Sequence, residues 1–77
     1  MITDSQLIFM VSLKIPYIIM EIIRELKVTS DEAFEIFYSS YTYSLLSSKE
    51  TYYWGESAQY VADSFFRENK GLTIEEY

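Results

Sequence analysis

The chain has 77 residues, of which 49% are hydrophobic and 18% aromatic, and its net charge is -6. This apolar content predicts one folded domain over residues 1–77 rather than a disordered chain. The negative charge has the wrong sign for gripping phosphate backbones, so no nucleic-acid partner is expected. Cysteine and histidine are absent, which excludes disulfides, thiolate nucleophiles and soft-ligand zinc sites. We expect no cofactor or metal, and the lack of disulfides favours a cytoplasmic protein.

The first predicted helix begins near Asp4, because Thr3 and Gln6 fit a capping box. Its apolar residues repeat at helical spacing along one arc, which we expect to be buried, while Lys14 and Tyr17 are expected on the opposite face. The apolar arc comprises Ile8, Val11, Ile15, Ile18, Ile19, Ile22, Ile23 and Leu26.

Pro16 lies inside this helix and allows two interpretations, one bent helix or two successive helices. The helical phase continues across the proline, but we favour a break or sharp kink within residues 12–15. Charged and polar residues interrupt the apolar stretch, and they argue against a membrane span. The residues before it contain no lysine or arginine, so a secretory signal is not expected either.

A second helix is predicted over Ser30 to Ser39, because Thr29 and Glu32 form another capping box. Its expected buried face comprises Ala33, Phe34, Ile36 and Phe37, followed by Tyr41. Ser40 then caps a short third helix that ends near Leu46.

The segment between the third and last helices is predicted to be irregular. Residues 47–50 form a loop, and residues 51–54 form an extended or irregular aromatic segment. Ser57 caps the last helix, and Gly71 terminates it. Its expected buried stripe comprises Ala58, Val61, Ala62 and Phe65. The tail 72–77 is expected either to fray or to dock back. The fold class is therefore all-α, a small bundle of three to four helices with an irregular aromatic segment before the last helix.

The aromatic middle, residues 37–61, holds six of the eight tyrosines and the single tryptophan. A core of this size cannot hold all of these rings, so some must be exposed, and we expect Tyr17, Tyr41 and Tyr53 to be among them. Exposed tyrosine and tryptophan provide rigid amphipathic contact area that is typical of binding hot spots. The predicted partner-binding residues are Tyr41, Glu50, Tyr52, Tyr53, Trp54 and Glu56.

The aromatic middle also carries a resemblance to a known family. The residues that carry it are Phe37, Tyr38, Ser40, Thr42, Tyr43, Leu46, Glu50, Thr51, Trp54, Ser57, Tyr60 and Val61. In order and spacing they resemble small Gram-positive bacterial proteins that overlap with the family called domain of unknown function 3791. Many members carry a glycine where this chain has Tyr52. The resemblance implies genes that lie in mobile elements beside small toxin-like genes, and it supplies no catalytic residues.

Three functions follow from these features. The favoured one is a non-catalytic protein-protein interaction module that binds and restrains a partner encoded nearby, as an antitoxin or inhibitor does. The alternative is a structural homodimer, with Met20 and Ile23 of the apolar helix most exposed to a partner. A distant alternative is an acidic mimic of nucleic acid. Carboxylate pairs such as Glu56 with Asp63 fit a solvated surface better than an acid-base site, so no enzyme is expected.

Overall fold

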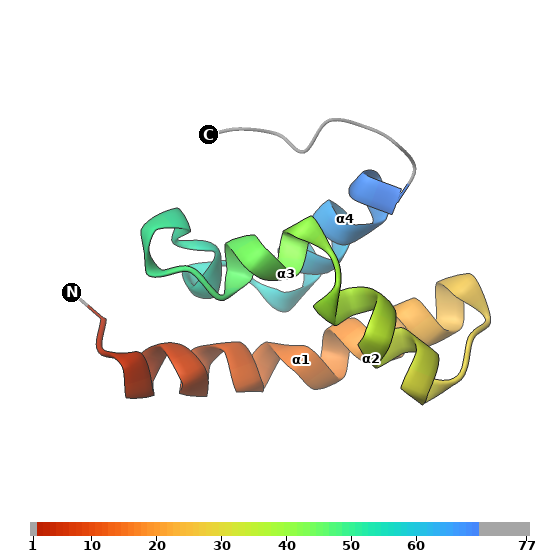
Figure 1. Cartoon of the computed structure of the whole chain (residues 1–77), viewed down its shortest axis with the longest axis horizontal. Coiled ribbons are helices and arrows are strands. Elements are labelled where there is room, and N and C mark those ends of the chain that lie inside the picture. Colours follow the sequence, from red (N-terminus) through yellow and green to blue (C-terminus); the bar gives the residue numbers. More distant parts are fainter. Residues whose placement is uncertain (1, 70–77) are drawn as a thin grey trace.

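The computed structural model describes residues 2–69. This part of the chain is all-α, with four α-helices, two short 3₁₀ helices and no strand, which confirms the predicted small bundle. The elements are α1 (Asp4–Leu26), α2 (Ser30–Tyr38), α3 (Tyr41–Leu46), η1 (Lys49–Thr51), η2 (Tyr53–Gly55) and α4 (Ala58–Asn69). Figure 1 shows two layers, with α1 and α2 beneath α3, the 3₁₀ helices and α4. The predicted stop at Gly71 and the tail 72–77 lie outside the described residues.

Helix α1 begins as the sequence predicts. The Thr3 side chain accepts a hydrogen bond from the Gln6 backbone N–H, and the Gln6 side chain accepts one from the Thr3 backbone N–H. A break near Pro16 is wrong, because α1 is one continuous helix of 23 residues with Pro16 inside it, whereas a kink within residues 12–15 stays a prediction. An internal proline costs about 3 kcal/mol. Burial of Ile18 and Ile22 contributes about 1.5–3 kcal/mol each and offsets that cost.

The core lies between the two layers, where α1 meets α2 and α4. Its edge-to-face ring pairs include Phe37 with Phe65, at a centroid distance of 5.7 Å, and Phe37 with Tyr43, at 5.5 Å. These geometries match the arrangement that aromatic quadrupoles favour. The buried hydrophobic residues are Ile18, Ile19, Ile22, Ala33, Phe37, Leu46, Tyr53, Val61, Ala62 and Phe65.

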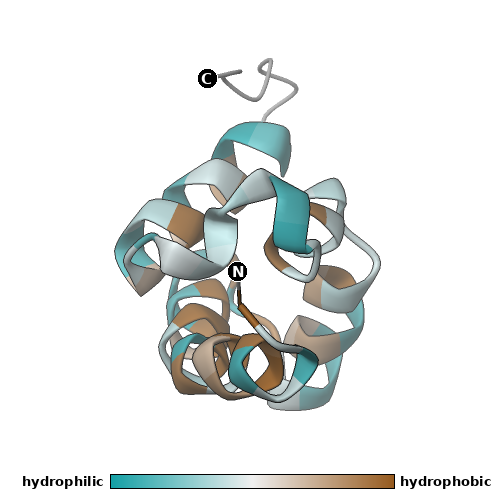
Figure 2. Cartoon of the chain, turned by 90° about the vertical axis from the view of Figure 1, so that its left-hand side faces the viewer, coloured by the Kyte–Doolittle hydropathy of each residue, from teal (hydrophilic) through white to brown (hydrophobic). Residues whose placement is uncertain are grey.

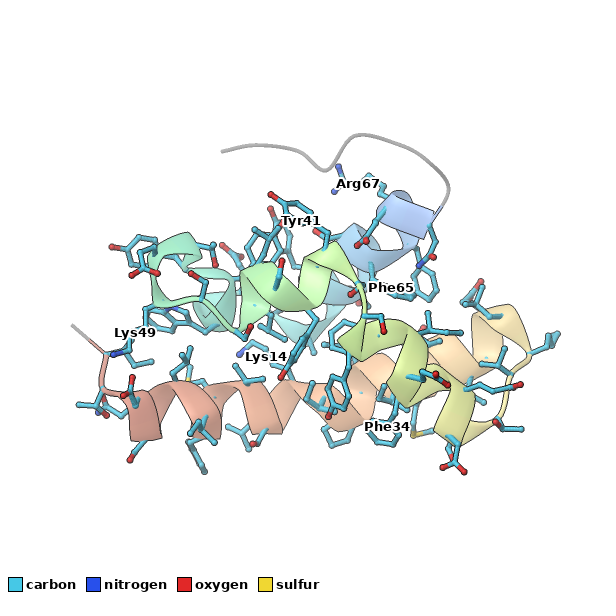
Figure 3. The ribbon with its side chains drawn as sticks, viewed as in Figure 1. Lys14, Phe34, Tyr41, Lys49, Phe65 and Arg67 are labelled. Carbon is cyan, nitrogen blue, oxygen red and sulfur yellow. The ribbon has the colours of Figure 1, made fainter. Side chains whose placement is uncertain are left out.

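Two expectations for α1 are wrong. Ile8, placed in the buried arc, is 65% exposed, and Leu26 is exposed as well, because the upper layer covers the centre of α1 better than its ends. Lys14, placed on the solvent face, is only 8% exposed. Its side chain points from α1 toward the upper layer (Figure 3), and its ammonium donates to the Met10 carbonyl oxygen at 3.4 Å.

Helices α2 and α3 have the predicted starts. Thr29 and Glu32 form the capping box of α2, and Ser40 Oγ accepts from the Tyr43 backbone N–H at 3.0 Å to cap α3. Ala33 and Phe37 are buried as expected, whereas Phe34 is exposed, contrary to the prediction. Tyr41 is exposed, as expected for the aromatic middle and not as a continuation of the buried face of α2.

The aromatic segment between α3 and α4 is not extended. It forms η1 and η2, and Tyr52 joins them in the left-handed conformation with φ 62°. The Thr51 hydroxyl donates to the Leu45 carbonyl oxygen and ties this connection to the end of α3. Ser57 Oγ accepts from the Tyr60 backbone N–H at 3.0 Å, as the predicted cap of α4 requires.

Candidate partner-binding surface

Four of the six predicted partner-binding residues belong to the η1–η2 segment and remain accessible. Glu50, Tyr52 and Glu56 are exposed, and Trp54 is half-buried. Tyr52 has the most exposed ring of the segment, at 67%. The 3₁₀ turns therefore present these residues as one part of the molecular surface.

The other two predicted residues lie elsewhere. Tyr41 is exposed at the start of α3, and Figure 3 shows it on the upper side of the molecule near Arg67, away from Lys49. Tyr53 was expected to be exposed, and that is wrong, because it is 2% exposed in the core. Its hydroxyl lies 3.3 Å from Ser64 Oγ, and its ring lies 5.7 Å from the ring of Tyr60. A buried ring cannot reach a partner, so Tyr53 leaves the candidate surface.

Trp54 lies between two hollows at the end of the molecule that carries η1 and η2. One hollow is lined by Ile2, Lys49, Glu50, Tyr52 and Trp54 and has a volume of about 430 Å³. The indole N–H donates to the Lys49 carbonyl oxygen at 3.0 Å, and the indole lies 5.9 Å from the Tyr52 ring. The hydrogen bond satisfies the single polar group of Trp54, so the ring is fixed with its apolar faces available for contact.

The second hollow lies on the α1 side of Trp54. It is lined by Ile2, Gln6, Phe9, Met10 and Trp54. Phe9 is 62% exposed, and the sequence analysis did not include it in the site. The signal was present, because residues 7–11 are five consecutive apolar residues that must point to every side of a helix. We call the residues Ile2, Phe9, Glu50, Tyr52 and Trp54 the Trp54 surface.

An ion pair connects this surface to the start of α1. Lys49 Nζ lies 2.6 Å from Asp4 Oδ1, and the bond from Lys49 lowers the pKa of the Asp4 carboxyl. Hydrogen bonds from the Ser48 hydroxyl and from the backbone N–H of Glu50 lower the pKa of the Glu50 carboxyl. Because Lys49 pairs with Asp4, Glu50 and the exposed Glu56 give the edge of the Trp54 surface a negative charge.

The backbone conformation of Tyr52 distinguishes it from the other exposed aromatics. A non-glycine residue at positive φ is uncommon, and a bulky side chain there costs about 1 kcal/mol or more. Within residues 2–69 the only other such residue is Lys27, at the C-terminal cap of α1, a position where this conformation is usual. Tyr52 thus combines a strained backbone conformation with an exposed ring.

The described part of the chain offers little evidence for other kinds of site. No group of three or more potential metal-ligating side chains occurs within residues 2–69. A third hollow, between the first half of α1 on one side and the end of α2 and α3 on the other, is lined largely by apolar residues. Helix α1 is long and apolar enough to cross a membrane by length and composition, but Ile18, Ile19 and Ile22 on it are buried in the bundle.

No protein family, curated protein or solved structure matches the chain. The resemblance to the domain of unknown function 3791 proteins therefore remains a prediction.

Proposed function

We propose that this chain is a non-catalytic protein-protein interaction module that binds and restrains a partner protein through the Trp54 surface. The observation that carries the proposal is the exposed Tyr52 ring, held at a strained backbone position beside the anchored Trp54. Strain of this kind is retained where a side chain has a task beyond stabilising the fold.

The chemistry of the surface indicates the kind of partner it fits. Trp54, Tyr52, Phe9 and Ile2 provide aromatic and aliphatic contact area around two hollows. Glu50 lies at the edge of this surface, and its lowered pKa favours the ionised carboxylate over the neutral acid. An apolar anchor flanked by lysine or arginine would complement this arrangement in both shape and charge.

Nucleic-acid mimicry receives less support from the same structure. Several carboxylates are engaged within the molecule, where Asp4 pairs with Lys49 and Glu21 pairs with Arg24. Glu32 and Glu68 accept hydrogen bonds from backbone N–H groups of α2 and α3. A mimic needs a row of carboxylates that are free to face a basic groove.

The test uses affinity capture from the native host, followed by titration of the captured partner against purified protein. The variant Tyr52→Gly removes the ring and also relaxes the backbone. Lys27→Gly is the matched control, because it relaxes the only other positive-φ residue of the described chain without touching the Trp54 surface.

We expect wild type and Lys27→Gly to bind one stoichiometric partner. Tyr52→Gly should bind it at least ten-fold more weakly, because it loses a central aromatic contact worth about 1.4 kcal/mol or more. Equal affinity for Tyr52→Gly and Lys27→Gly would overturn the assignment of the surface. The absence of any stoichiometric partner would overturn the interaction-module proposal itself.

A further inference from the structure

Helix α1 has a second apolar face that the bundle leaves uncovered. Phe9, Leu13, Tyr17 and Met20 follow one another at spacings of four, four and three residues, which places them on one side of the helix. They are 62%, 62%, 41% and 68% exposed, respectively. Figure 2 views the molecule from the N-terminal end of α1. The brown of hydrophobic residues on this helix is not confined to the side that faces the other layer. We call these four residues the outer stripe, which shares Phe9 with the Trp54 surface.

The outer stripe is as large as the largest apolar patches that monomeric proteins usually show. If a fully exposed large side chain presents about 200 Å², the four residues expose on the order of 500 Å². Patches of about 300–600 Å² are the largest that monomeric proteins usually show, and they are often functional. Two such stripes packed together would bury about 900 Å², the size of a weak or transient interface.

The charges on and around the outer stripe argue against a membrane surface as its occupant. Helices that lie on membranes carry lysine and arginine along their polar face to meet anionic lipids. In α1, Lys14 is buried and Arg24 is the one exposed basic side chain, while the chain as a whole has a net charge of -6. Repulsion from an anionic bilayer therefore opposes adsorption through this helix.

The spacing of the outer stripe fits a second copy of itself. From these observations we propose that two copies of this chain dimerise through α1, with the two helices antiparallel and the outer stripes in contact. An antiparallel pair that is centred near Ile15 places Phe9 against Met20 of the second copy and Leu13 beside Tyr17 of the second copy. Aromatic-sulfur contacts of the Phe9–Met20 kind add to the burial of apolar area.

Charge selects the antiparallel direction. Between Gln6 and Arg24 the outer stripe carries no charged side chain. A parallel pair would bring Arg24 against Arg24 of the second copy, and like charges at such spacing are destabilising. The antiparallel pair instead places Arg24 near Gln6 of the second copy, which can accept a hydrogen bond from the guanidinium. The two-fold symmetry that results is the commonest symmetry of protein dimers.

The first experiment measures molar mass by light scattering and sedimentation over a range of concentrations. Leu13→Lys introduces a charge into the centre of the outer stripe. Ile8→Lys is the matched control, because Ile8 is equally exposed on the same helix but lines the hollow with Tyr38 and Tyr43 instead. We expect wild type and Ile8→Lys to dimerise with a dissociation constant in the micromolar range, about that of a small interface, and Leu13→Lys to weaken dimerisation at least 100-fold.

Monomeric wild type at about 1 mM would overturn the proposal, as would equal weakening by both lysine variants. Circular dichroism of each variant checks that the helices remain, which is expected because both sites are exposed.

The direction of the helices is tested by crosslinking, since the chain contains no cysteine. In the antiparallel dimer, Phe9→Cys chains mixed with Met20→Cys chains form a disulfide between the two different variants, and each variant alone does not. Crosslinking of Phe9→Cys with itself would indicate a parallel pair and would contradict the proposed geometry. Binding of wild type to anionic phospholipid vesicles with no dimer in solution would assign the outer stripe to a membrane instead.

Discussion

Glu68 of α4 holds the first turn of α3 through Thr42. Its Oε1 atom accepts a hydrogen bond from the Thr42 backbone N–H at 2.9 Å and another from the Thr42 hydroxyl at 2.8 Å. Its Oε2 atom accepts from the Tyr41 backbone N–H at 2.8 Å. Helix α3 has only six residues, too few to be stable alone. The carboxylate also satisfies N–H groups at the positive end of the α3 dipole.

Replacing Glu68 should therefore lower the stability of the whole bundle. We expect Glu68→Ala to reduce the free energy of unfolding by about 2–3 kcal/mol, because it leaves the two donors of the buried Thr42 without their acceptor. Glu68→Gln keeps one acceptor oxygen and should lose about half as much. Urea denaturation of the three proteins measures the difference, and a loss below about 0.5 kcal/mol for Glu68→Ala would contradict this role.

The contact between Glu68 and Thr42 marks a limit of what the sequence could predict. Thr3 with Gln6 and Thr29 with Glu32 are capping pairs three residues apart, so their geometry follows from the helix itself. Glu68 and Thr42 are 26 residues apart. No local pattern indicates which carboxylate reaches across a bundle, because that depends on how α4 packs on α3.

The candidate site shows the same limit. Composition and the amphipathic character of tyrosine and tryptophan predicted that the aromatic middle contains a surface, and Tyr52 and Trp54 are part of one. The segment was predicted as extended or irregular, and neither form indicated which of Tyr52 and Tyr53 faces the core. The left-handed backbone at Tyr52 turns the two neighbouring rings apart, one outward and one into the core. Contacts distant in sequence, such as Tyr53 with Ser64, decide that outcome.

The strain at Tyr52 leads to a stability prediction that is independent of any partner. Glycine adopts positive φ without a steric penalty, so Tyr52→Gly should raise the free energy of unfolding by about 0.5–1 kcal/mol. Lys27→Gly should raise it by a similar amount, since Lys27 has φ 58° at the end of α1. Thermal and urea unfolding measure both changes. A clear loss of stability in Tyr52→Gly alone would mean that the ring supports the fold rather than a partner.

Removing the buried charge of Lys14 should stabilise the protein, whereas removing Glu68 should destabilise it. The Lys14 ammonium has a backbone carbonyl as its hydrogen-bond acceptor, and burial lowers its pKa from the ordinary 10.5. Lys14→Met keeps the apolar stem and removes the charge, so it should stabilise the protein by about 1 kcal/mol at neutral pH. Urea denaturation at pH 7 provides the comparison, and destabilisation by Lys14→Met would contradict it.

The lowered pKa of Lys14 also predicts a pH dependence. The unfolded chain holds this proton up to a pH near 10.5, whereas the folded chain releases it earlier, so stability rises between the two pKa values. Lys14→Arg provides the control, because arginine stays charged across that range. The difference in stability between wild type and Lys14→Arg should widen as the pH rises toward 10.5. A constant difference would show that Lys14 does not titrate there.

The ion pair between Asp4 and Lys49 should make the junction of α1 with η1 sensitive to acid. Lys49 lowers the pKa of Asp4 below its ordinary 3.8, so the stabilisation is present above that value and is lost as the pH falls through the folded pKa. Both groups reach solvent, and salt will screen the pair. Lys49→Met should therefore be less stable than wild type at pH 7 in low salt, and this difference should shrink in about 1 M salt.

Well below the folded pKa of Asp4 the difference should disappear, because the carboxyl is then protonated in both proteins. A double-mutant cycle uses Asp4→Asn, Lys49→Met and the variant that carries both changes. It separates the ion pair from the favourable effect of Asp4 at the start of α1. Urea midpoints across the pH series measure the stability of each protein in the cycle. If the gap between wild type and Lys49→Met were as wide at low pH as at neutral pH, the stabilising contact of Lys49 would be its packing beside Trp54 and not its charge.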